Sequence, residues 1–145
     1  MIGLILAGHG GFSEGMASTV SMLTGPQEHL EKVSFLPEDT LDTLKEKFIS
    51  AISKLADCTQ IIVLSDIFGG SPYKCALELA LNDPRLHIMA GTNIGMACEA
   101  AISRFSYGDI HSFIESLIEA GKASVSYTDV KALMAPQNDD PDEDL

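Results

Sequence analysis

The sequence has little positive charge, because 9 lysines and arginines stand against 21 aspartates and glutamates, for a formal net charge of −12. Such a chain has no basic surface with which to hold a nucleic-acid backbone or an anionic membrane. Five of the acidic side chains lie within residues 136–145, which show no apolar periodicity. We therefore expect no nucleic-acid partner, one domain over residues 1–135, and a disordered acidic tail over residues 136–145.

Cysteines and long apolar runs are also scarce. The three cysteines, Cys58, Cys75 and Cys98, form no C-x-x-C pair, which excludes a disulfide framework and a zinc ribbon. No apolar run approaches the roughly 20 residues of a membrane-spanning helix, and the chain does not open with the basic segment and apolar core of a secretion signal. We therefore expect a protein of the reducing cytoplasm.

Short apolar runs and helical patterns alternate along the chain. The run IGLILA is apolar throughout, as expected of a strand buried on both faces of a parallel sheet, and IIVLS is expected to be another buried strand. Strands are expected at residues 2–7, 30–36, 61–65 and 86–90, with a short last strand at 124–127. Helices are expected at 13–23, 40–55, 72–81, 96–105 and 109–120. This order predicts a three-layer α/β fold, a mainly parallel sheet with helices on both faces.

Two glycine-containing loops follow the first and third predicted strands. The first, AGHGGFSEG, places His9 among glycines, and the second, SDIFGGSPYK, contains Asp66 and a helix start in which Ser71 is expected as N-cap. Because the carboxyl ends of parallel strands share one edge of a sheet, both loops are expected on the rim where such sheets bind ligands. A helix start on that rim favours an anion.

His9, Asp66 and the helix start would supply a nucleophile, a group that orients it and an anion site. Asp66 would accept a hydrogen bond from Nδ1–H of His9, which leaves Nε2 free to attack. The oxygens of a phosphoryl group would be held by the Ser71 hydroxyl and by the amides of Gly70, Gly10 and Gly11. This constellation predicts phosphoryl transfer onto histidine, with no cofactor and no metal when the donor is itself a phosphohistidine.

These motifs resemble the IIA domains of the mannose/fructose/sorbose/N-acetylgalactosamine family of the bacterial phosphoenolpyruvate-dependent sugar phosphotransferase system. The likeness covers nearly the whole chain, from GLILAGHGG through VLSDIFGGSPYKCALELA to IMAGTNIGM. It implies that His9 is the phosphorylated histidine, Asp66 its partner and Ser71 the serine on the phosphate side. One departure is Gly95, where several relatives carry proline.

The resemblance also implies partners. Phosphate would enter from the carrier protein HPr and leave to a IIB component, and the membrane components IIC and IID would be reached only indirectly. The protein is expected to form a homodimer that exchanges the strand at 124–127. Since no IIB-like segment follows, a free-standing IIA subunit is expected.

Other interpretations of these loops remain weaker. The segment GFSEG matches the G-x-S-x-G elbow of serine hydrolases, but five residues separate Ser13 from the first strand, so Ser13 is expected to cap a helix. GHGGFS lacks the third glycine of a dinucleotide fingerprint, and the four histidines lack metal-site spacing. Within the family that the chain resembles, two alternatives stay open: a phosphocarrier that feeds a dihydroxyacetone kinase, and a regulatory phosphohistidine domain.

Overall fold

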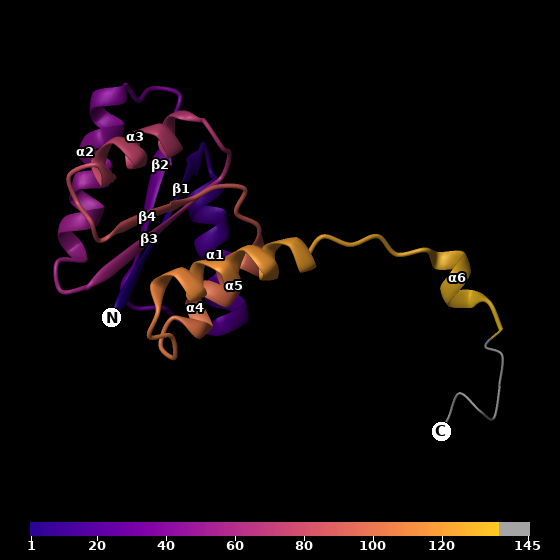
Figure 1. The fold of residues 1–145 in the computed structure, drawn as a ribbon. Helices are drawn as coiled ribbons and strands as arrows, with labels where there is room; N and C mark the ends of the chain where they lie inside the picture. The colour runs from indigo at the N-terminus through magenta and orange to yellow at the C-terminus, as the bar shows by residue number, and fades with distance from the viewer. Residues whose placement is uncertain (137–145) are drawn as a thin grey trace.

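The computed structural model describes residues 1–136 and contains one parallel sheet of four strands in the order β2-β1-β3-β4. The strands are β1 (Ile2–His9), β2 (Leu30–Phe35), β3 (Gln60–Ser65) and β4 (Leu86–Met89). The helices are α1 (Phe12–Thr24), α2 (Leu41–Lys54), α3 (Ser71–Ala80), α4 (Ile94–Ser103), α5 (Ile110–Ala123) and α6 (Val130–Met134). Figure 1 shows the sheet between two groups of helices, which confirms the predicted three-layer α/β fold.

The two layers of core follow from the alternation of side chains along the buried strands. In β1, Leu4 and Leu6 join the core beneath α1, α4 and α5, whereas Ile5 and Ala7 join the core beneath α2 and α3. All four side chains are at most 1% exposed. A strand that is apolar on both faces can lie only in the middle of such a sandwich, which is where β1 lies.

The topology places a ligand site beside the end of β1. The chain moves from β1 to β2 in one direction across the sheet, and β3 and β4 then lie on the other side of β1. The crevice between the carboxyl ends of β1 and β3 is therefore the switch point of the sheet. His9 is the last residue of β1, and Asp66 directly follows β3.

Two predicted helix caps are wrong by one or two residues. Helix α3 begins at Ser71 itself, with Gly70 in an extended conformation as N-cap and Pro72 in the first turn, where its missing N–H is not needed. Helix α1 begins at Phe12 with Gly11 as N-cap. The Ser13 hydroxyl does not cap the helix, because it is buried and hydrogen-bonded to the Ser34 hydroxyl at 2.7 Å.

The segment after α5 leaves the packed body of the domain. Ser124 is the C-cap of α5, and residues 125–129 have no regular secondary structure before the short helix α6. Figure 1 shows this segment running away from the sheet, so the strand expected at 124–127 is not formed within the single chain. Strand exchange requires a second copy and stays a prediction. Apart from Pro136, the predicted acidic tail lies outside the described residues.

None of the helices within residues 1–136 combines the length and the apolar character needed to cross a bilayer.

Candidate functional site

His9 lies at the carboxyl edge of the sheet with its ring partly open to solvent. The side chain is 47% exposed, and its Nδ1 lies 2.8 Å from Oδ2 of Asp66. Because an ionised carboxylate can only accept hydrogen bonds, Nδ1 must carry the proton. With the proton on Nδ1, the neutral form of the ring has its lone pair on Nε2.

Asp66 holds both the ring and the backbone of His9. The backbone N–H of His9 donates to the same Oδ2 at 2.8 Å, and the N–H of Ile67 donates to Oδ1 at 2.8 Å. Partial burial alone would raise the pKa of Asp66, but the hydrogen bonds from the His9 backbone and ring, together with that from Ile67, outweigh it and lower the pKa below its usual value. Asp66 is therefore a charged orienting group at neutral pH.

Two glycines that flank this pair permit its close packing. A Cβ on Gly8 would lie 2.9 Å from Cγ of Asp66 and 2.5 Å from the Phe12 ring. A Cβ on Gly70 would lie 2.9 Å from Cε1 of His9. Gly70 was expected to offer an amide, and its missing side chain also leaves room for the ring of His9. Gly8 was not among the predicted residues, since only the fold brings Asp66 and Phe12 against it.

The other predicted phosphate-binding groups differ in how well they are placed. The N–H of Gly10 donates to the Phe35 carbonyl at 2.9 Å, so this amide is already used. The N–H of Gly70 donates to the Ile67 carbonyl, but at a long 3.3 Å. Gly11 is the exposed N-cap of α1, whose first-turn amides have no partner within the helix. Glycine amides from two helix starts thus flank the loop that carries His9.

Ser71 lies next to Gly70 but is not hydrogen-bonded to His9 in the described part of the chain. It borders a hollow of about 340 Å³ between α2 and α3, together with Lys45, Lys74 and Cys75. Since Pro72 has no N–H, the first turn of α3 offers the amides of Ser71 and Tyr73. The structure therefore places Ser71 at the start of α3, beside Gly70 and on the edge of this hollow.

Phe35 is a further contact of the histidine that sequence reasoning missed. Its ring meets the His9 ring edge-on, with centroids 5.8 Å apart. Phe35 ends β2 beside β1, where its register partner is His9. It leaves one side of the imidazole against an aromatic edge, while Asp66 holds Nδ1. The register of two parallel strands could have indicated this neighbour.

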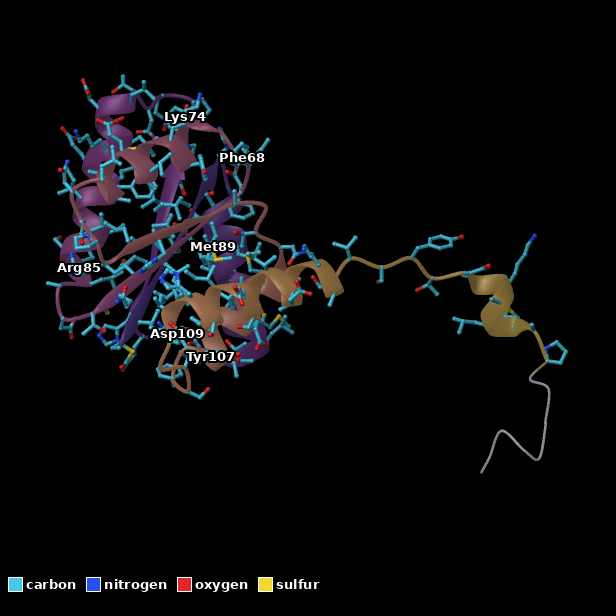
Figure 2. All side chains as sticks on the ribbon, viewed as in Figure 1. Phe68, Lys74, Arg85, Met89, Tyr107 and Asp109 are labelled. Atoms are coloured by element: carbon cyan, nitrogen blue, oxygen red, sulfur yellow. The ribbon has the colours of Figure 1, made fainter. Side chains whose placement is uncertain are left out.

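The surface beside the pair is apolar. Ile67 is 56% exposed and Phe68 is 77% exposed, and the Phe68 ring packs on Tyr73 with centroids 5.0 Å apart. Figure 2 places Phe68 and Lys74 at the end of the molecule where β3 leads into α3. A groove of about 490 Å³ begins at Asp66 and follows β4 and α5, with Ile88, Met89, Ile114 and Ile118 in its walls. Exposed apolar side chains around a reactive group are typical of a protein-docking surface.

Known proteins resemble this chain in sequence and in fold. The family model described as "PTS system fructose IIA component", where PTS stands for phosphotransferase system, matches residues 3–118. The PTS system fructose-specific EIIA component of Bacillus subtilis is 32% identical over 99 residues, which cover 68% of each protein. The mannose/sorbose specific IIA subunit from Enterococcus faecalis has a TM-score of 0.80 and 28% identity, over 88% of this chain and 95% of that chain.

A longer relative shows how far the likeness extends. The PTS system mannose-specific EIIAB component of Escherichia coli K12 is 28% identical over 124 residues, which cover 86% of this chain. The match covers 38% of that relative, so this chain corresponds to less than half of its length.

Proposed function

This chain belongs to the family of PTS IIA components, and from that membership we propose that it carries a phosphoryl group on His9 from HPr to a IIB component during sugar uptake. The observation that carries the proposal is the 2.8 Å hydrogen bond between Nδ1 of His9 and Asp66 at the switch point of the sheet. It leaves one ring nitrogen, Nε2, to accept the group.

The transfer needs no proton to move when the phosphorylated ring of the donor carries a proton on its other nitrogen, because that ring then leaves as a neutral imidazole. The lone pair of Nε2 attacks the phosphorus in line, a P–N bond forms, and the bonding pair of the breaking P–N bond returns to the nitrogen of the donor histidine. The ring of His9 then bears positive charge, which the adjacent Asp66 carboxylate stabilises. First-turn amides of α1 and α3 supply hydrogen bonds to the phosphoryl oxygens. The reverse sequence passes the group to the acceptor.

The exposed apolar rim supports docking of protein partners. Ile67 and Phe68 stand directly after Asp66 and offer apolar area to any protein that approaches His9. HPr and the IIB component would use this rim in turn. We place the relay in the cytoplasm, in accord with three cysteines that are all unpaired.

The proposed homodimer has support at the edge of the sheet. Strand β4 pairs with β3 alone, so its outer edge is unpaired in the described chain and lies along the apolar groove. The segment 125–136 exposes apolar side chains, among them Val125 at 75%, Tyr127 at 89% and Leu133 at 74%. A partner's segment paired with β4 would cover both surfaces.

Phosphorylation assays test the function directly. We expect the tag-free protein, mixed with labelled phosphoenolpyruvate, enzyme I and HPr, to take up one acid-labile phosphoryl group per chain. His9→Gln removes the nucleophile and is expected to abolish labelling. His111→Gln changes an exposed histidine on α5 and serves as the matched control, with labelling unchanged. Labelling that survives in His9→Gln would contradict the proposal.

A further inference from the structure

A second group of metal-ligating side chains lies at the opposite end of the sheet. A ring nitrogen of His29, a carboxylate oxygen of Asp57 and Sγ of Cys58 all lie within 4.8 Å of one another. His29 directly precedes β2, and the other two precede β3, so the loops at the amino ends of two strands bring them together. The function proposed for His9 does not use this cluster.

The backbone of His29 is held in an unusual conformation. Its φ is 55°, which makes it the one residue other than glycine with positive φ among residues 1–136. Its carbonyl accepts hydrogen bonds from the N–H of Leu4 at 2.9 Å and from Nη1 of Arg104 at 3.0 Å. These bonds fix the backbone of His29, whose ring lies close to Asp57 and Cys58 in the loop that leads into β3.

The ring of His29 is incompletely satisfied. Its Nε2 lies 3.3 Å from Oδ2 of Asp57, a long distance for a hydrogen bond to a carboxylate. Its Nδ1 is buried and has no hydrogen-bond partner in the described chain. A buried polar atom without a partner is costly, and it is uncommon in folded proteins.

Cys58 presents its sulfur from a fixed position. The residue is 3% exposed, and its Sγ packs so closely on Gly3 that a Cβ there would lie 3.0 Å away. Burial, and secondly the charge of Asp57, raise the pKa of the Cys58 thiol.

We propose that His29, Asp57 and Cys58 bind one zinc ion, with water as the fourth ligand. Sulfur, imidazole nitrogen and one carboxylate oxygen form a donor set typical of zinc, whereas magnesium and calcium select oxygen ligands. Tetrahedral zinc ligands stand about 3.3–3.7 Å apart, so atoms that now lie up to 4.8 Å apart need to close by up to about 1.5 Å. Asp57, whose side chain is 75% exposed, is free to make that movement.

Bound zinc would join the entry of β2 to the entry of β3. Because only the folded chain brings the three ligands together, zinc binding would stabilise the folded domain. The free energy of unfolding would rise with the logarithm of the zinc concentration. The sequence indicated no metal site, since 28 positions separate His29 from Asp57 and no short motif connects them. The proposal departs from that expectation.

Zinc and cobalt binding to tag-free protein under reducing conditions test the site. We expect one equivalent of zinc by calorimetry, a rise in Tm with added zinc, and thiolate-to-metal absorption in the near ultraviolet when cobalt replaces zinc. Cys58→Ser and His29→Gln are each expected to weaken zinc binding at least about 10-fold and to remove the rise in Tm. Cys58→Ser is also expected to remove the cobalt absorption. Cys98→Ser, on α4, is the matched cysteine control and is expected to bind as the unaltered chain does.

The outcomes separate this site from the relay on His9. Unaltered protein that binds no zinc, or Cys58→Ser that binds it with equal affinity and the same cobalt spectrum, would overturn the proposal. If Cys58→Ser does not fold, Asp57→Asn, a change at an exposed position, gives the same comparison. Labelling of His9 in Asp57→Asn is expected to be normal, so failure of one proposal leaves the other standing.

Discussion

Two polar side chains, one at each end of the sheet, are bonded in different ways. At the carboxyl end, His9 is 47% exposed; one of its ring nitrogens is held by Asp66, and the other has no hydrogen bond to any of residues 1–136. At the amino end, Arg104 is 3% exposed, and its two terminal nitrogens donate to four oxygen atoms. Figure 2 shows the distance between these ends, with Phe68 near the first and Tyr107 and Asp109 near the second.

The bonds of Arg104 serve stability, whereas those of His9 serve the proposed chemistry. The guanidinium of Arg104 joins three backbone carbonyls, those of Ile2, Glu28 and His29, to the side chain of Gln27. Such bonds fix the chain and leave no reactive lone pair, whereas the incomplete bonding of His9 leaves one. Changes at the two ends are therefore expected to affect different measurements.

The largest effect is expected from Arg104→Met. It removes the donor that three backbone carbonyls share; the His29 carbonyl keeps its bond from the N–H of Leu4, whereas those of Ile2 and Glu28 lose the bond from Arg104. Each buried carbonyl left unpaired costs about 1–3 kcal/mol, so we expect a loss of roughly 3–5 kcal/mol in the free energy of unfolding. Urea unfolding measures it. Arg85→Met is the control, since Arg85 pairs with Asp83 near the surface and its loss is expected to cost less than about 1 kcal/mol. Equal losses would contradict the comparison, as would slower labelling of folded Arg104→Met.

Asp66→Asn is expected to have the next largest effect, this time on rate. Asparagine cannot hold Nδ1–H as a carboxylate does, so we expect labelling of His9 by HPr to slow by roughly 100-fold. Rapid-quench labelling measures the rate, and Asp42→Asn at the exposed start of α2 is the control. An unchanged rate would remove the orienting role of Asp66.

The same variant tests the charge of Asp66 in the folded protein. Because folding lowers the pKa of this carboxyl, its contribution to stability is complete above the unfolded value of about 3.9 and is lost as pH falls through the folded value. The difference in stability between the unaltered protein and Asp66→Asn is therefore expected to shrink with acidification. A difference that stays constant from neutral pH to acid unfolding would show that the pKa is not lowered.

Gly8→Ala is expected to have a smaller effect at the carboxyl end. Its Cβ would lie 2.5 Å from the Phe12 ring and 2.9 Å from Asp66, so the pair must shift, at a cost of about 1–3 kcal/mol in stability and with slower labelling. Gly15→Ala is the matched control, because a Cβ there meets nothing within 4 Å and alanine favours helix α1 by about 1 kcal/mol. Thermal unfolding and labelling rates compare the two variants, and similar behaviour of both would show that Gly8 has no special role.

Truncation of the chain after Ser124 is expected to have the smallest effect on the two ends of the sheet. The hydrogen bonds found in the removed segment are local, such as that from the N–H of Leu133 to the carbonyl of Asp129. Under the exchange proposal, the molar mass in solution falls from that of a dimer to that of a monomer, while circular dichroism of the domain is retained. A mass that does not change on truncation would contradict strand exchange.

The sequence was sufficient for the sheet and for the central pair of the site. Apolar runs identify β1 and β3 because both faces of these strands are buried, and parallel pairing then brings His9 and Asp66 to one edge. The sequence was insufficient where the partners are backbone atoms, because the carbonyls that bind Arg104 cannot be recognised from the pattern of side chains. The role of Gly8 depends on Phe12 and Asp66, which approach it only after folding.

The ring of His9 has a single free nitrogen, with Asp66 on its other nitrogen and Gly70 against Cε1. Under the proposed function, phosphate is loaded and unloaded at that one atom, so the supplier and the receiver cannot occupy it together. The relay then works by turnover of short-lived complexes, and a surplus of the empty receiver inhibits loading by competition. Flux through such a carrier depends on how quickly each visitor departs, which favours weak contacts on the apolar rim over tight ones.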